Sequence, residues 1–402
     1  MEVKPGYKQT EVGVIPEEWE VKLLPEVLRF RGGKAHEQHI SETGRYICVN
    51  SKFISTDGEV RKYSSANFCP ANKGDVLMVM SDLPNGRALA KAYLVDEDDT
   101  YAVNQRVCAL TAYRDCPEYF FYVLNRHPYF LKFDNGVSQT HLLNSVFQKC
   151  PIPVPPRVDE QRAIAAALSD VDWLLGGLDR LIAKKRDLKQ AAMQQLLTGQ
   201  TRLPGFHGEW EVKALGNIVE KIVGGGTPSR SNSAFWGNEI PWVTVKDFAT
   251  FNPRHSQESI TRLGLRNSAS HLIPAGTLIT STRMALGKAV VYEVDVTINQ
   301  DLKALFLKPD TSVGFLTYWF EHFGGLIDEL GSGSTVKGIS LVELRRFPFH
   351  SPPHAEQTAI ATVLSEMDGE LAVLEERREK TRALKQAMMQ ELLTGRTRLP
   401  VQ

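Results

Sequence analysis

Two stretches of the chain carry apolar residues alternately four and three positions apart, with charged and polar residues between them. This spacing is typical of the buried seam between two coiled-coil helices. At ~1.5 Å per residue, a stretch of ~40 residues forms a rod of roughly 60 Å. We therefore predict one long helix at 158–200 and a second at 355–402. The predicted seam residues are Ile164, Leu168, Val171, Leu175, Leu178 and Ile182 in the first, and Ile360, Leu364, Met367, Leu371 and Leu374 in the second.

The sequence also indicates where these helices begin and end. The first follows Pro155-Pro156, Asp159 suits its N-cap, and Gly199 suits a left-handed residue at its end, as Gly395 does in the second. The seam turns polar around residues 184–186 and 377–378. Core packing between two helices explains the seam without any further role, but the length of the rods suggests that they set a distance. We expect the seam to resume at Leu188, Leu196, Leu384 and Leu392.

The two stretches belong to an internal repeat. Residues 160–204 and 356–400 align without a gap at an offset of 196 residues, and both end in TRLP. Fainter matches lie outside the helices: EWEVK occurs twice, Asn-Gln occurs at 104–105 and 299–300, and a Pro-Pro pair precedes each long helix. A long repeat predicts two copies of one structural unit. The last residues point back toward the first, as if a circular molecule had been cut once.

A globular segment precedes each predicted helix, at 1–157 and at 201–354. Both mix short apolar runs with Gly, Asn and Asp turns, and both contain a helical pattern, at 117–133 and at 313–330. The predicted fold class is α+β, with two pseudo-symmetric globular α+β domains joined by two long antiparallel coiled-coil helices. The globular segments resemble each other less than the helices do, which indicates that they diverged toward two targets.

The composition is that of an ordinary globular protein. The chain has 402 residues, 42% of them hydrophobic, with 47 basic and 47 acidic side chains and no net charge. This balance argues against a uniformly basic nucleic-acid binder, because Lys and Arg supply most of the affinity for phosphates. No apolar run approaches the ~18 residues of a membrane span, and no signal peptide is evident, so we expect a cytoplasmic protein.

Neither metal binding nor catalysis is predicted for this chain. The five cysteines lie in the first half without a CxxC pair, and we expect them to be reduced. His36 and His39 stand three residues apart in a turn-like context, where we expect solvent-facing side chains rather than metal ligands. The chain lacks a Walker A motif, a complete dinucleotide fingerprint and the Asn-Pro-Pro-aromatic motif of amino-methyltransferases.

The globular segments instead offer polar loops rich in Arg, Lys, Asn, Gln and Ser. Side chains of these types read base edges in the major groove, and glycines let the backbone approach a phosphate. Such loops are also common on protein surfaces that bind nothing. The candidate DNA-binding residues are Arg31, Lys34, Arg87, Arg106 and Gln139 in the first segment, and Thr227, Ser229, Arg230, Lys246, Arg283, Thr335 and Lys337 in the second.

Taken together, these features resemble a known family, the specificity (S) subunits of type I restriction-modification systems, also called HsdS. The resemblance is carried by YKQTEVGVIPEEWEV at the start, by GGGTPS followed by IPW and Lys-Asp, by the PP-x-EQ-x-x-I entry into each long helix, and by the LLTG-x-TRLP exit. It covers essentially the whole chain. The first segment departs from it, because RGGKAHEQ stands where GGGTPS is expected.

The resemblance implies a division of labour. Each globular domain would be a target recognition domain for one half of a bipartite site in double-stranded DNA. The helices would set the spacer and dock two modification (methyltransferase) subunits, which would bind S-adenosylmethionine and methylate adenine; restriction subunits would join for cleavage. This chain would be non-catalytic and bind no cofactor, leaving S-adenosylmethionine, ATP and Mg²⁺ to its partners. The flipping of the target base would cost energy while the recognition domains hold the duplex.

Two other readings remain open. The chain could be a coiled-coil scaffold whose globular ends bind proteins or sugars and never DNA. It could also be a self-sufficient methyltransferase or nuclease, if a cofactor site were hidden in a non-standard motif. Selection from a pool of random DNA separates the first reading from DNA recognition, because only a specificity subunit would retain a gapped two-part motif.

Overall fold

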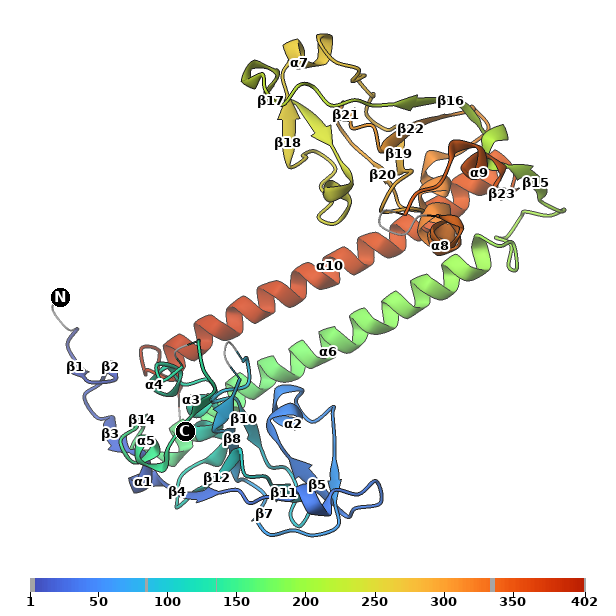
Figure 1. Ribbon diagram of the computed structural model, residues 1–402. Coiled ribbons are helices and arrows are strands. Elements are labelled where there is room, and N and C mark those ends of the chain that lie inside the picture. The colour runs from blue at the N-terminus through green and yellow to red at the C-terminus, as the bar shows by residue number, and fades with distance from the viewer. Residues whose placement is uncertain (1–3, 84–85, 135, 333–336, 401–402) are drawn as a thin grey trace. The chain divides into compact units, whose positions relative to one another are not determined.

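The computed structural model describes residues 4–83, 86–134, 136–332 and 337–400. The chain divides into two compact units (Figure 1). The first unit comprises residues 1–179 and 377–402, and the second comprises residues 180–376. Each unit therefore contains one globular part and one half of each long helix. Within the described residues, no helix combines the length and the apolar character needed to cross a membrane.

The two long helices are α6 (Val158–Leu196) and α10 (His354–Leu392), each of 39 residues. Asp159 lies inside the first turn of α6, so its predicted role as N-cap is wrong. The helices end at Leu196 and Leu392, three residues before Gly199 and Gly395, but both glycines have the predicted left-handed backbone, with φ of +73° and +67°.

The halves of α6 and α10 run antiparallel within each unit. The ion pairs between the helices follow this direction, because residues farther along α6 meet residues nearer the start of α10. The pairs in the first unit are Asp172–Lys385 at 2.5 Å and Asp179–Arg378 at 3.4 Å, and those in the second are Lys185–Glu370 at 2.5 Å and Lys189–Asp368 at 2.8 Å.

The apolar stripe of each helix has two kinds of contact. Near the start of each helix, Ile164 and Leu168 join the core of the first unit, while Ile360 and Leu364 join that of the second. Farther along, Leu178, Ile182 and Leu371 are buried, and Val171, Leu175, Met367 and Leu374 are half-buried. Leu188 and Leu384 are exposed, so the prediction that they resume the seam is wrong. Leu196 and Leu392 are buried in the cores of the second and first units.

The first globular part is built on two four-stranded sheets. One has the order β10-β8-β12-β4 and the other the order β6-β5-β11-β7. Short helices cover the sheets, and strand β3 pairs with β14 just before α6. The strands are β1 (Tyr7–Thr10), β2 (Gly13–Pro16), β3 (Glu20–Leu23), β4 (Leu28–Gly32), β5 (Tyr46–Val49), β6 (Tyr63–Ser64), β7 (Pro70–Ala71), β8 (Val76–Val79), β9 (Ser81–Asp82), β10 (Ala92–Leu94), β11 (Tyr101–Val103), β12 (Val107–Ala112), β13 (Thr140–His141) and β14 (Pro151–Val154), and the helices are α1 (Leu24–Val27), α2 (Ser51–Ser55), α3 (Pro117–Leu124), α4 (Pro128–Leu131) and α5 (Asn144–Gln148), with the 3₁₀ turn η1 (Glu37–His39).

The second globular part repeats this plan. Its sheet β16-β22-β19-β20 has the strand order of the first sheet read from the other edge, and its sheet β18-β17-β21 corresponds to β6-β5-β11, each with one parallel pair. The strands are β15 (Glu211–Ala214), β16 (Val219–Gly224), β17 (Trp236–Val243), β18 (Glu258–Ile260), β19 (Leu278–Ser281), β20 (Ala289–Val291), β21 (Thr297–Ile298), β22 (Leu302–Leu307) and β23 (Pro348–Ser351), and the helices are α7 (Arg262–Arg266), α8 (Val313–Leu330) and α9 (Leu341–Arg346), with the 3₁₀ turns η2 (Leu215–Asn217), η3 (Ser233–Phe235) and η4 (Val245–Phe248). The α+β fold class is confirmed.

One predicted helix is broken. Residues 117–133 form α3 and α4 rather than one helix, because Arg126 adopts a left-handed backbone with φ of +58° and Pro128 follows it. The corresponding pattern at 313–330 contains no proline and forms the single helix α8, as predicted.

The chain ends meet within the first unit, and the same contacts join continuous chain in the second. Tyr7 donates its hydroxyl to the carbonyl oxygens of Gly395 and Arg396, at 3.2 and 3.1 Å. Arg398 then binds the buried Glu160 at the start of α6. In the second unit, Arg202 binds the buried Glu356 at the start of α10. This match explains why the sequence looks circular.

Candidate nucleic-acid interface

In the first unit, four segments meet at one end of the sheets. The loop after β4 binds the end of β11, because the Lys34 N–H donates to the Val103 oxygen at 3.0 Å. The turn after β11 binds the end of β8 through Met80 N–H and the Arg106 oxygen, at 2.9 Å. Met80 in turn accepts from the Leu142 N–H at 2.8 Å. We call these segments, residues 33–37, 80–82, 104–106 and 139–142, the first recognition frame.

The second unit contains the same hydrogen bonds at equivalent places. Gly226 N–H donates to the Ile298 oxygen at 3.0 Å, and Thr282 N–H donates to the Asp301 oxygen at 2.9 Å. The Ile339 N–H donates to the Thr282 oxygen at 3.0 Å. Residues 225–227, 282–284, 299–303 and 337–339 therefore form a second recognition frame with the backbone plan of the first.

Glycines make this close backbone approach possible. A Cβ on Gly33 would lie 2.1 Å from the Asn104 oxygen, and one on Gly225 would lie 1.7 Å from the Ile298 oxygen. Both distances are far below van der Waals contact, so neither position accepts a side chain without a backbone shift. The structure thus gives these glycines an internal packing role, where the sequence suggested an approach to phosphate. It also shows that GGKA at 32–35 and GGGT at 224–227 occupy equivalent positions despite their different letters.

The first frame presents a mixed set of polar side chains. Lys34 and Arg106 are exposed, and Gln139 donates to the Ser81 hydroxyl at 2.9 Å. Glu37 accepts from the amides of Asn104 and Gln105, at 3.2 and 3.1 Å. These bonds, together with the stronger effect of its own backbone N–H, lower the pKa of Glu37 and keep it charged. A charged carboxylate at such a place accepts from the amino group of cytosine.

The second frame presents different chemistry on the same backbone. Thr227 donates to the side-chain oxygen of Gln300 at 2.8 Å, and Arg283 lies 3.6 Å from Asp301. Lys303 donates to the Gln300 carbonyl oxygen at 2.6 Å, and burial lowers its pKa. Arg283 takes the position of Ser81, and Asp301 that of Arg106, so the two frames offer different donors and acceptors.

Arg230 lies in a separate cluster next to the second frame. Both of its terminal nitrogens donate to the Glu258 carboxylate, and its guanidinium lies 3.8 Å from the centre of the Trp236 ring. The ion pair lowers the pKa of Glu258. The Ser229 oxygen accepts from the Trp236 indole at 3.1 Å, and Lys246 is exposed nearby, where its charge also favours the carboxylate. Arg230 can offer both terminal nitrogens to one base edge only if it leaves Glu258.

Three other predicted residues have side chains outside these contacts. Arg31 binds the buried Asp75 at 3.0 Å and the Pro70 oxygen at 2.7 Å, so its guanidinium is engaged in contacts within the first globular part. Lys337 belongs to the second frame through its backbone, but its amine binds Asp328 at 2.7 Å. Arg87 is exposed on the loop before β10. Thr335 lies outside the described residues.

Sequence reasoning passed over Glu37, Gln300 and Trp236. Gln300 could have been found from the sequence, because the repeated Asn-Gln pair at 104–105 and 299–300 marks the turn at the centre of each frame. Trp236 could not have been found in this way, because its role depends on Arg230 and on Glu258 in a neighbouring strand. His36 was predicted to face solvent, but it is buried, with its ring bonded to the Lys34 oxygen and to the Phe68 N–H.

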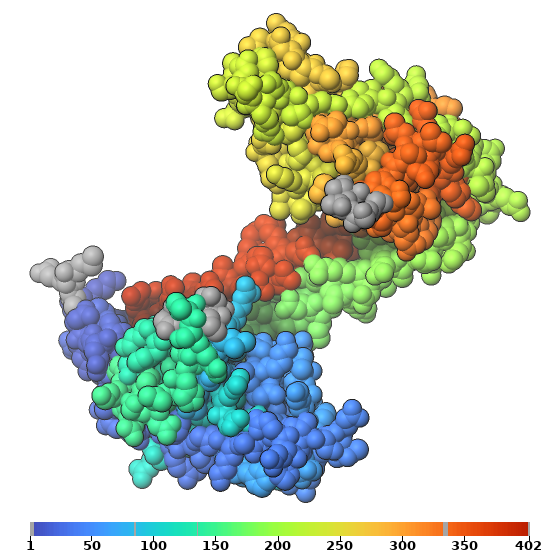
Figure 2. Space-filling view, viewed as in Figure 1, coloured from blue at the N-terminus to red at the C-terminus, as the bar shows by residue number. Residues whose placement is uncertain are grey.

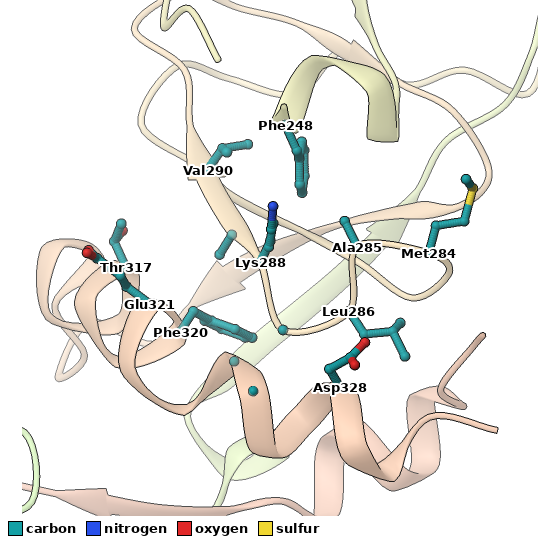
Figure 3. A pocket seen from close by; sticks show the side chains of 14 residues that line it. Phe248, Met284, Ala285, Leu286, Lys288, Val290, Thr317, Phe320, Glu321 and Asp328 are labelled. Atoms are coloured by element: carbon teal, nitrogen blue, oxygen red, sulfur yellow. The ribbon is translucent and has the colours of Figure 1, made fainter. Parts of the chain in front are cut away.

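A pocket of about 790 Å³ lies in the second unit between α8 and the loop that precedes β20 (Figure 3). Phe248, Leu286 and Phe320 line it, and the Lys288 side chain extends toward Phe248. Glu321 and Asp328 also line it, and two carboxylates repel a phosphate. The pocket is therefore unsuited to the DNA backbone, and the recognition frames remain the candidate interface. Within the part of the chain that the structure describes, no cluster of side chains could hold a metal ion.

Comparisons with known proteins place the chain in a family. The family model for the type I restriction modification DNA specificity domain matches the chain twice, at residues 16–180 and 207–382. The putative type I restriction enzyme MjaX specificity subunit of Methanocaldococcus jannaschii is 25% identical over 98% of this chain and 97% of its own length. The EcoR124I/EcoR124II specificity subunit of Escherichia coli is 29% identical over 62% of this chain and 63% of its own length.

Solved structures show the same fold. The S subunit of a type I restriction-modification system from M. genitalium has a TM-score of 0.62 and 14% identity, with 98% of both chains covered. A chain from a study of the assembly and conformational transition of the type I restriction-modification system has a TM-score of 0.60 and 22% identity, covering 95% of this chain and 99% of that one. Because the family model matches both halves, the chain belongs to the type I restriction modification DNA specificity family.

Proposed function

We propose that this chain is the DNA-recognition subunit of a type I restriction-modification complex, in which each recognition frame reads one half of a bipartite site. One observation carries the proposal. The two frames share a set of backbone hydrogen bonds but present different side chains, such as Ser81 and Arg283 at one shared position. A common scaffold with exchanged donors and acceptors suits two different base sequences.

The long helices would hold the two frames for one duplex and dock two modification subunits, with restriction subunits joining the complex. The chain has no net charge, so its partners would supply much of the attraction to phosphate. S-adenosylmethionine, ATP and Mg²⁺ would bind to those partners, which would carry out methylation and cleavage. This chain would contribute specificity and no catalytic group.

Selection from random duplex DNA tests the proposal. The chain is mixed with the pool at two salt concentrations, with and without modification subunits, and the retained DNA is sequenced. We expect a motif of two fixed parts separated by an unspecified spacer. A pool without any motif, in the presence of modification subunits, would support the scaffold reading instead.

Arg283 provides a test at the level of one residue. Its guanidinium is more than half exposed and only loosely paired with Asp301, so it is available to a base edge. Arg283→Ala should relax one half-site and leave the other intact, with a loss of about 1–3 kcal/mol of discrimination. The control is Arg254→Ala, because Arg254 is also exposed and ion-paired, with Glu293, but lies outside the frame. An equal loss for every sequence would identify Arg283 as a phosphate contact.

A further inference from the structure

In the first unit, three side chains from three helices meet at one carboxylate. Tyr122 of α3 donates its hydroxyl to Asp172 of α6 at 2.9 Å. Lys385 of α10 binds the other oxygen of Asp172 at 2.5 Å, and its amine lies 5.6 Å from the centre of the Tyr122 ring. We call Tyr122, Asp172 and Lys385 the first clamp. It ties the globular part to both long helices at once.

The second unit contains a second clamp of the same chemistry. Tyr318 of α8 donates to Asp368 of α10 at 2.7 Å, and Lys189 of α6 binds the other oxygen of Asp368 at 2.8 Å. Lys189 also binds Glu321 of α8 at 2.9 Å. These hydrogen bonds raise the pKa of Lys189 even though burial alone would lower it, so the amine stays charged. Figure 2 shows the orange surface of α8 meeting the long helices in this unit.

The clamps are related by the internal repeat. Each pair of equivalent residues is separated by 196 positions, the offset of the helical repeat, and the helices exchange roles between the units. The aspartate comes from α6 in the first clamp and from α10 in the second, while the lysine comes from the other helix. The globular parts differ in sequence, but both retain the tyrosine that reaches this point.

A second anchor fixes each globular helix near its start. Gln357 of α10 accepts from the Ser312 N–H at 2.8 Å, just ahead of α8, and Gln161 of α6 accepts from the Cys116 N–H at 3.0 Å, just ahead of α3. Each clamp aspartate follows its glutamine by 11 residues, about three turns or ~16 Å of helix. The glutamine and the aspartate lie on either side of the residues by which the long helix packs into the core of each unit, so the two polar contacts fix the direction of this packed joint.

We propose that the two clamps fix the angle of each recognition frame on its helix pair and thereby make the chain strict about the number of base pairs between the half-sites. This inference rests on the proposed function. One base pair advances the duplex by about 3.4 Å and turns it by about 35°. For a globular part ~30 Å across, the axial advance alone corresponds to a tilt of about 7°. A strict spacer therefore demands a stiff joint as well as rods of fixed length.

The test uses the full chain assembled with modification subunits and a DNA pool in which the two half-sites are fixed and the spacer varies in length. The variant Tyr318→Phe/Lys189→Met removes the second clamp. We expect the unchanged chain to retain one spacer length. The variant should retain the same half-sites but admit spacers one base pair longer or shorter. The share of these spacers in the retained DNA should rise about tenfold. This is equivalent to about 1.4 kcal/mol, on the scale of one hydrogen bond to a charged group.

Two matched variants separate positioning from general weakening. Arg186→Met removes an ion pair with Glu375 that joins the helices without contacting α8, so spacer selectivity should not change. Lys189→Arg keeps a charged donor and should restore most of the strictness. If the double variant does not fold, Tyr318→Phe alone keeps the ion pair and the packed ring while removing the hydroxyl, and a smaller widening of the spacer range is expected.

The outcomes are distinguishable. If a folded clamp variant selects one spacer length as sharply as the unchanged chain, the inference is wrong although the proposed function stands. If Arg186→Met widens the range as much as the clamp variant does, stiffness of the helix pair rather than the clamp is responsible, and the inference is again wrong. If the unchanged chain selects no half-site at all, the proposed function itself fails.

Discussion

Arg31 was a candidate DNA contact, but its surroundings predict a structural role that substitution can test. The Arg31 guanidinium is about one-third exposed and donates to Asp75, whose side chain is 1% exposed. Asp75 also accepts from the Thr111 hydroxyl at 2.5 Å and from the Asn72 N–H at 3.0 Å. The substitution Arg31→Met keeps most of the aliphatic stem but leaves a buried carboxylate without its counter-charge.

The expected loss can be estimated from this geometry. Removing one partner of a fully buried ion pair costs about 3–5 kcal/mol, and losing a hydrogen bond to a charged group costs about 1.5–3 kcal/mol. The two remaining donors and the partial exposure of Arg31 place the cost at the overlap of these ranges, about 3 kcal/mol. For a unit of this size, that corresponds to a fall in melting temperature of about 6–12 °C.

Calorimetry of the full chain measures this loss in the transition of the first unit. The double variant Arg31→Met/Asp75→Asn provides the control, because the amide carries no charge, its oxygen can accept from the Asn72 N–H, and its NH2 group can donate to the Thr111 hydroxyl. It should recover more than half of the lost stability. If Arg31→Met melts like the unchanged chain but loses selectivity for one half-site, Arg31 reads DNA and the structural reasoning is refuted.

Two further predictions concern stability. Burial lowers the pKa of His127 to about 4 from 6.5, so the unfolded chain takes up the proton first and stability falls as the pH drops through this window. Between about pH 7 and pH 5 the loss should be roughly 2 kcal/mol in urea titrations, and it should vanish in His127→Asn, which keeps a capping acceptor for the Tyr129 N–H. Met284 has a left-handed backbone, with φ of +70°, and an exposed side chain. Met284→Gly should therefore raise the free energy of unfolding by about 1 kcal/mol, and an unchanged or lower value would show that the side chain contributes packing.

The long helices, the repeat and the α+β class could be predicted from the sequence because each depends on local spacing or on self-similarity. Helix α8 shows a continuous apolar pattern and was predicted with its bounds. The break between α3 and α4 was missed although Pro128 signals it. The exposure of Leu188 and Leu384 could not be predicted, because it depends on what the other helix places opposite each turn.

The recognition frames were only partly accessible to sequence reasoning. The polar loops could be found, but the role of each charge depends on residues far away in the chain. Arg31 pairs with Asp75, 44 positions away, and Arg230 pairs with Glu258, 28 positions away. Nothing in a single sequence reveals those pairings. The shared position of Gly33 and Gly225 was equally hidden, because it shows only in backbone distances.

The matched joints have a consequence for how such a protein can change. The contacts that hold each globular part are made by the glutamine and aspartate of one long helix and the lysine of the other, at positions repeated between the two units. A gene segment encoding one globular part would meet the same partners if recombination moved it to the other place. New combinations of half-sites could thus arise by shuffling two cassettes, without any adjustment of the framework that receives them.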